Sequence, residues 1–298
     1  MNKFNKNNIQ NLNRVLSSTH INFLFGAGVN GNALPQMNKF VKTKTLAEKY
    51  LKRKVVNLEN DIEDLTEAKK KNVMNTFLKE LKEEISKIDN DHADINDISN
   101  MFIAINNLVL QTENRNSTMK QVNIYTTNYD SITDNVLKKL GFLYNSISSS
   151  NYSNHDKFFE MIGFDYKKRK YMPTYLISKI HGDIDDPILP SISKYNEALQ
   201  SKRFEILFNM RGQLSRYNSV LFVIGYSGND KHINELINSA TTFGLTVYWF
   251  LYDNDETIPN DLSQNIIFIE QVNNDEKQNS TKTCKEVVES IWQNQLEE

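Results

Sequence analysis

The feature that most limits the fold is a set of short apolar runs spread along the chain. The run SVLFVIGYS, residues 219–227, is almost wholly apolar, as expected of a strand buried on both faces. Comparable runs predict further strands at 21–25, 122–127, 174–180, 245–252 and 265–270. Alternation of such strands with helical segments is typical of a parallel sheet with helices on both faces. The sequence therefore predicts an α/β, Rossmann-like fold.

One long helical block interrupts this pattern. From about residue 42 to residue 114, apolar side chains recur at helical spacing, and a separate helix is expected at 95–110. The chain has five prolines and no obvious linker, so we expect one domain over 1–298 with a helical insertion at 42–118. Helices are also predicted at 5–18, 130–140 and 284–296, whereas the polar, aromatic stretch 142–172 permits no assignment.

Charge and cysteine content exclude several classes of protein. The net charge is −2, from 35 basic and 37 acidic residues, which gives no general basis for nucleic-acid binding. Cys284 is the only cysteine, so paired-cysteine zinc sites are excluded and a reducing cytoplasm is favoured. No apolar run is long enough to span a bilayer, so we expect a cytoplasmic protein without a membrane partner. Since neither an EF-hand nor an H-E-x-x-H pattern occurs, we also expect no metal.

A glycine turn follows the first apolar run directly. Gly26-Ala27-Gly28-Val29-Asn30-Gly31 has the G-x-G-x-x-G spacing that receives a dinucleotide pyrophosphate, with a helix N-terminus supplying positive charge. A redox enzyme would need an acidic residue at the end of the next strand, about 20 residues on. Here that region is helical and rich in lysine, with Glu48 in mid-helix. The turn alone is also consistent with a tight connection that binds nothing.

Three predicted strands end in polar clusters instead of ordinary turns. These clusters are TTNYD (126–130), KIHGDIDDP (179–187) and IGYSGNDKHI (224–233). Each cluster taken singly has a structural interpretation, since asparagine and aspartate cap helices and glycine forms turns. The carboxyl ends of parallel strands, however, are where open α/β sheets bind ligands. Together with the glycine turn, the clusters predict one polar site at that edge of the sheet.

In order and approximate spacing, these motifs resemble those of the sirtuin family. The residues that carry the resemblance are Gly26-Ala27-Gly28, Thr126-Thr127-Asn128-Tyr129-Asp130, His181-Gly182 and Gly225-Tyr226-Ser227. The likeness runs from about residue 20 to residue 252, without the helical block. It is closest to the bacterial sirtuin-like proteins of anti-phage defence that consume NAD⁺.

The resemblance implies a role for each matching residue. Asn128 and His181 would flank the nicotinamide ribose as the catalytic pair. Asp130 would contact the nicotinamide carboxamide. The phosphates and the adenosine side would be held by the remaining cofactor-binding candidates, which are Gly26, Ala27, Gly28, Asn30, Gly225, Ser227 and Asp230.

Several positions depart from the family pattern. Asn30 stands where the family commonly has serine, and Thr127 replaces a glutamine. Residues 34–38 lack the phenylalanine and arginine of the corresponding family segment. Sirtuins that deacylate proteins usually carry four zinc-binding cysteines, and this chain has one. The missing cysteines favour hydrolysis of NAD⁺ over deacylation.

The expected activity is that of an NAD⁺ glycohydrolase, which converts NAD⁺ as substrate into ADP-ribose and nicotinamide. Two alternatives stay open: an NAD-dependent protein deacylase, and a non-catalytic sensor of NAD⁺ or ADP-ribose. The resemblance also implies a role as a defence effector that depletes NAD⁺. Expected partners are further copies of the chain in a homo-oligomer, a hexameric DNA-translocating ATPase or an Argonaute-like protein.

Overall fold

The computed structural model describes residues 19–89, 91–111, 120–148, 174–187, 203–251, 266–269 and 280–297. These residues form a seven-stranded sheet in the order β3-β4-β2-β1-β5-β6-β7, and every neighbouring pair of strands is parallel. The strands are β1 His20–Phe25, β2 Val122–Thr126, β3 Tyr144–Ile147, β4 Tyr175–Lys179, β5 Ser219–Ile224, β6 Thr246–Phe250 and β7 Ile266–Ile269. The predicted α/β, Rossmann-like class is confirmed.

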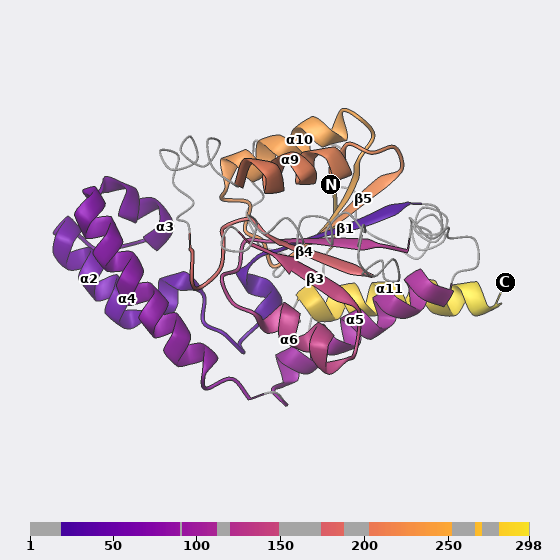
Figure 1. Cartoon of the computed structure of the whole chain (residues 1–298), viewed down its shortest axis with the longest axis horizontal. Helices are drawn as coiled ribbons and strands as arrows, with labels where there is room; N and C mark the ends of the chain where they lie inside the picture. The colour runs from indigo at the N-terminus through magenta and orange to yellow at the C-terminus, as the bar shows by residue number, and fades with distance from the viewer. Residues whose placement is uncertain are drawn as a thin grey trace, which may run out of the picture.

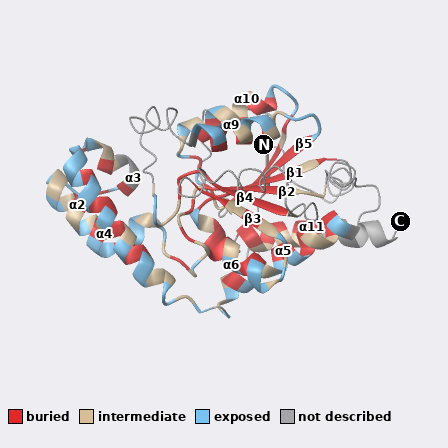
Figure 2. Ribbon diagram, viewed as in Figure 1, coloured by how far each residue is buried: buried red, intermediate tan, exposed pale blue. Residues whose placement is uncertain are grey.

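Helices cover both faces of the sheet (Figure 1). One face carries α9 (Arg203–Leu214) and α10 (Lys231–Thr241), and the other carries α5 (Ala93–Gln111), α6 (Ile132–Lys139) and α11 (Ser280–Glu297). Side chains on a strand alternate between faces. Accordingly Leu24 packs in the core beneath α9 and α10, whereas its neighbours Phe23 and Phe25 belong to the core beneath α5 and α11. Burial on both faces explains the continuous apolar runs (Figure 2).

A second group of helices lies beside the sheet (Figure 1). It consists of α2 (Val41–Leu51), α3 (Leu58–Asp61) and α4 (Glu67–Ile85), with short 3-10 helices at Met37–Lys39 (η2) and Ile62–Asp64 (η3). Glu80 of α4 joins two of these helices, because its buried carboxylate accepts the backbone N–H groups of Lys42 at 2.9 Å and Thr43 at 2.7 Å. A side chain of one helix thereby caps the N-terminus of another.

The observed elements differ from the predicted ones mainly at boundaries. The run 219–227 is a strand only to Ile224, because Gly225 has a φ of 64° and turns the chain. Helix α11 begins at Ser280 rather than Cys284, and β3 lies in the stretch that permitted no assignment. Helix α9 was not predicted. The predicted helix 5–18 lies outside the described residues.

Two parts of the predicted insertion occupy different places. Helix α5 packs against α11 beneath the sheet, whereas α2–α4 stand at its side (Figure 1). The boundaries 42–118 and the single-domain division stay predictions. In the described ranges, no helix combines the length and the hydrophobicity needed to cross a bilayer.

Strand order places a switch point between β1 and β5. From β1 the chain continues to β2 on one side, and the later strands β5, β6 and β7 extend the sheet on the other side. The connections leaving β1 and β5 therefore diverge at their carboxyl ends. In open α/β sheets this is where a crevice forms and a ligand binds.

Candidate functional site

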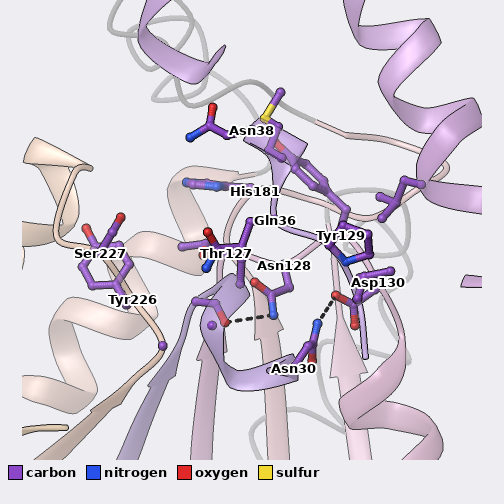
Figure 3. Close-up of a pocket in the computed structure, with 18 of the residues that line it drawn as sticks. Asn30, Gln36, Asn38, Thr127, Asn128, Tyr129, Asp130, His181, Tyr226 and Ser227 are labelled. Atoms are coloured by element: carbon purple, nitrogen blue, oxygen red, sulfur yellow. Dashed lines mark hydrogen bonds between the residues drawn. The ribbon is translucent and has the colours of Figure 1, made fainter. Parts of the chain in front are cut away.

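A pocket of about 340 Å³ lies at the carboxyl ends of β1, β2, β4 and β5 (Figure 3). Its volume lies within the range of roughly 300–1,000 Å³ for small-molecule sites. Phe77 and Leu81 of α4 form part of its wall, so the side helices border the site. Every site residue expected from the sequence lines this pocket: Gly26, Ala27, Gly28, Asn30, Asn128, Asp130, His181, Gly225, Ser227 and Asp230.

The glycines permit two loops to touch through their backbones. The N–H of Gly28 donates to the carbonyl oxygen of Gly225 at 2.9 Å. A Cβ at Gly26 would lie 2.4 Å from that same oxygen, and a Cβ at Gly225 would lie 2.1 Å from the nitrogen of Val29. Since real Cβ atoms do not approach so closely, no other residue fits either position without movement of the backbone. The loops after β1 and β5 are thus joined at the switch point.

The expectation of a helix N-terminus at the glycine turn is wrong. Only a four-residue 3-10 helix, η1 (Ala27–Asn30), follows β1, and Gly31 ends it with a φ of 57°. The next α-helix, α2, begins at Val41. So short a helix has little dipole to offer an anion. Moreover, the N–H of Gly28 is already used by Gly225, so the turn serves the contact between loops rather than a helix start.

Asn128 is held at the end of β2 by two hydrogen bonds. Its backbone N–H donates to Oγ1 of Thr126 at 3.0 Å, and its side-chain Nδ2 donates to the carbonyl oxygen of Gly26 at 3.2 Å (Figure 3). The side chain thereby links the ends of β2 and β1. Its Oδ1 has no hydrogen-bond partner among the described residues, which leaves an acceptor for a ligand or a water molecule in the pocket.

His181 follows β4 and is fixed by its neighbours. Gly182, with a φ of 76°, turns the chain directly after it. The ring Nε2 lies 3.0 Å from Oδ2 of Asp230, and both side chains are 8% exposed. The imidazole also packs beside the ring of Tyr129, and the centroids of these two rings are 6.4 Å apart. Hence an imidazole borders the pocket in one defined orientation.

Asp130 and Asn30 form a buried pair on the pocket floor. Nδ2 of Asn30 donates to Oδ2 of Asp130 at 2.9 Å, and the N–H of Ile132 donates to Oδ1 at 2.9 Å (Figure 3). Burial disfavours the charged form more than these bonds favour it, and the pKa of Asp130 is raised. The carbonyl oxygen Oδ1 of Asn30 is buried and has no hydrogen-bond partner among the described residues.

Asp230 begins helix α10. Its Oδ1 accepts the N–H groups of His232 at 3.0 Å and Ile233 at 3.3 Å, which is the geometry of an N-cap. Although burial opposes ionisation, the hydrogen bond from His181 and the two backbone bonds hold the pKa of Asp230 below its usual value. Both carboxylate oxygens are therefore engaged within the protein.

Several residues in or near the pocket were given no role by the sequence analysis. Phe40, Phe77 and Tyr129 form a chain of edge-to-face rings, with centroids 5.2 and 5.8 Å apart, along the apolar wall. Phe77 belongs to the helical block, where no motif marked it. Lys179 is buried at the end of β4 and donates to the carbonyl oxygen of Asp130 at 2.8 Å. A lysine inside an otherwise apolar strand is the signal that could have revealed it.

Metal ligands do not gather anywhere in the described part of the chain: no group of three His, Cys, Asp or Glu side chains could hold an ion there.

The parallel sheet and the polar pocket at its switch point define an α/β protein with a ligand site of the dinucleotide-binding type. A family model of the SIR2-like domain matches residues 122–275, just over half of the 298 residues, and the chain belongs to this family. The resemblance to sirtuins is thereby confirmed, and it supports a sirtuin-like, NAD-dependent function. The matched stretch contains Asn128 and His181 but not the glycine turn.

Two further comparisons add little. One solved structure, described as "Structural Basis for the Mechanism and Regulation of Sir2 Enzymes", is similar with a TM-score of 0.45 and 12% identity, over 98% of this chain and 100% of that chain. At that level the likeness carries no weight in the assignment. No curated protein matches the chain.

Proposed function

We propose that the protein is an NAD⁺ glycohydrolase, which converts NAD⁺ and water into ADP-ribose, nicotinamide and a proton. The bond between ribose C1′ and the pyridine nitrogen breaks, and its electron pair leaves with nicotinamide. A water oxygen then bonds to C1′ and loses a proton. The observation that carries this proposal is that the Asn128 amide and the His181 imidazole line one pocket beside the glycine contact.

Each side chain has a specific task in this reaction. The pyridine leaves as a neutral molecule from a cationic precursor, so the site needs no acid for departure; positioning and a well-placed water supply the acceleration. The amide of Asn128 is anchored through Nδ2 on Gly26, so its Oδ1 can orient that water. His181 then accepts the proton as general base.

The floor of the pocket suits the nicotinamide carboxamide. That group presents two N–H donors, and the carboxyl of Asp130, which Asn30 holds through a hydrogen bond, offers an acceptor on the pocket lining. Asn30 would thus support substrate recognition by holding the carboxyl of Asp130 in place.

We further propose that the enzyme is the NAD⁺-depleting effector of a bacterial anti-phage defence system, acting in the cytoplasm. Such an activity needs control, and the helices within 42–118 would supply it through a homo-oligomer or through a partner such as a hexameric DNA-translocating ATPase or an Argonaute-like protein. The same helices would otherwise serve as a simple cap, an alternative supported by Phe77 and Leu81 in the pocket wall.

Replacement of the proposed catalytic pair tests the function. Asn128→Ala and His181→Ala should each reduce nicotinamide release by about 10²-fold or more, because each removes a group that acts on the attacking water. Asn72→Ala and His92→Ala are matched controls, since both residues lie away from the pocket, and they should keep wild-type rates. Full activity in both pocket variants, with the fold intact by circular dichroism, would refute the assignment.

A further inference from the structure

The contact between His181 and Asp230 joins the segments that follow two different strands. His181 lies two residues after the end of β4, and Asp230 lies 49 residues later, at the start of α10. The Nε2–Oδ2 distance is 3.0 Å, and each side chain is 8% exposed. In so buried a place a hydrogen bond is strong and little screened by water. The imidazole therefore has a preferred orientation before any substrate binds.

The hydrogen bonds of Asp230 also define which ring nitrogen carries the proton. Two backbone N–H groups bond to Oδ1, and Oδ2 is left for His181. The bonds that Asp230 accepts hold its pKa low, so the side chain is an ionised carboxylate and can only accept. Nε2 of His181 must then be the protonated nitrogen. In the neutral ring, Nδ1 keeps the lone pair, and Nδ1 has no hydrogen-bond partner among the described residues.

We propose that Asp230 is a positioning residue that holds His181 in the tautomer with hydrogen on Nε2, so that Nδ1 is the basic nitrogen for the reaction. This inference rests on the proposed hydrolysis of NAD⁺ and assigns the proton of the attacking water to one atom. It also gives Asp230 a role other than the adenosine contact that the family resemblance implies, because its carboxylate bonds to His181 and to the start of α10. The carboxylate would act on the substrate only through the imidazole.

Asp230→Asn is the most informative change. The new amide oxygen can still accept the N–H groups of His232 and Ile233, so the cap of α10 is kept. The amide nitrogen, however, would face Nε2 as a donor and favour the opposite tautomer, with hydrogen on Nδ1. The change therefore separates the orientation of the histidine proton from the stability of the helix.

Nitrogen-15 NMR of the histidine rings reads the tautomer directly, without substrate. At about pH 8, above the ordinary histidine pKa, the His181 signal should show a protonated Nε2 in the wild-type protein and a protonated Nδ1 in Asp230→Asn. His181→Gln identifies the signal by its disappearance. A wild-type ring protonated on Nδ1, or an unchanged tautomer in Asp230→Asn, would overturn the proposal.

Steady-state kinetics of nicotinamide release are the second test. Asp230→Asn should lower kcat for nicotinamide release by about 10²-fold while KM changes by less than about threefold, since the lost interaction acts in the transition state. Glu235→Gln, which removes an exposed carboxylate from the same helix, should change neither value. A shifted tautomer with wild-type kcat would also overturn the proposal. If the wild-type protein releases no nicotinamide, the proposed function fails, and the NMR result alone decides how Asp230 holds the ring.

Discussion

At the scale of single residues, the most unusual environment is that of Asp130. Its carboxyl is buried on the pocket floor and accepts hydrogen bonds from Asn30 and from the backbone of Ile132. Burial nevertheless outweighs these bonds and raises the pKa of Asp130. The folded protein therefore opposes ionisation of this group, which favours a site that a ligand with N–H donors would complete.

This environment predicts a pH dependence of stability. An aspartate has a pKa of about 3.9 in an unfolded chain, and the pKa of Asp130 in the folded protein lies above that value. At a pH between these two pKa values, the folded state binds more protons than the unfolded state, so its stability falls as the pH rises. Asp130→Asn cannot titrate. The free energy of unfolding of both proteins is measured in urea from pH 4 to pH 7. The variant value minus the wild-type value should increase over this range, by about 1.4 kcal/mol for each unit by which folding raises the pKa of Asp130. A constant difference across that range would contradict this interpretation.

The sequence singled out residues that line one pocket, but not their pairings. Asn128 and His181 were found through the family resemblance, because short motifs at strand ends are visible in one dimension. The pair Asn30–Asp130 spans 100 residues and the pair His181–Asp230 spans 49. Such contacts depend on strand order and on loop geometry. Neither can be obtained from the spacing of motifs.

At the scale of elements, the contact between the β1 and β5 loops fixes the pocket. Gly225 adopts a φ of 64°, which disfavours other residues, and its backbone lies against Gly28 and Val29. The carbonyl oxygen of Gly26 in turn holds the amide of Asn128. A displacement of this contact would therefore move the proposed catalytic side chain of Asn128 as well as two strand ends.

Gly225→Ala should be severely destabilising. The change adds a strained φ and a Cβ that would lie 2.1 Å from the nitrogen of Val29, with an expected loss of at least about 3 kcal/mol in the free energy of unfolding. Gly141→Ala is the matched control, because Gly141 has a similar φ of 71° and nothing within 4 Å of its Cβ position. That variant should lose about 1 kcal/mol. Equal losses in urea denaturation would show that the loop contact is unimportant.

Most strands were predictable because both faces of the sheet are buried, which produces nearly continuous apolar runs. Strand β3 is different: Asn145 is buried in it beside half-buried Tyr144, so no apolar run marks the segment. In α9 the exposed side chains of Phe204 and Phe208 blur the helical pattern, since an outward face normally carries polar residues. These elements follow from tertiary packing rather than from local pattern.

At the scale of the whole molecule, the helices α2–α4 connect the pocket with the outer surface. Phe77 of α4 packs edge-to-face on Tyr129, whose ring lies beside His181. Val56, between α2 and α3, is 85% exposed, and Val41 at the start of α2 is 73% exposed. We propose that a partner bound to these helices would change the position of His181. The change would pass through the contacts of Phe77 with Tyr129 and of Tyr129 with His181.

Homo-oligomeric control predicts a definite mass. Native mass spectrometry of the isolated protein should show a multiple of 34.6 kDa, the mass of one chain. Dilution should shift the distribution toward the single chain, and the rate of nicotinamide release should change with it, because assembly and activity are coupled in this proposal. A strict monomer at all concentrations would leave control to a different partner and exclude the homo-oligomer.

The central claim is that this pocket hydrolyses NAD⁺ without a second substrate. The most direct measurement is a time course of pure protein with NAD⁺, with and without an acetylated peptide, in which all products are separated and quantified. We predict that nicotinamide and ADP-ribose form in equal amounts and that the peptide makes no difference. Nicotinamide release only in the presence of peptide, or binding of NAD⁺ with no release at all, would contradict the claim.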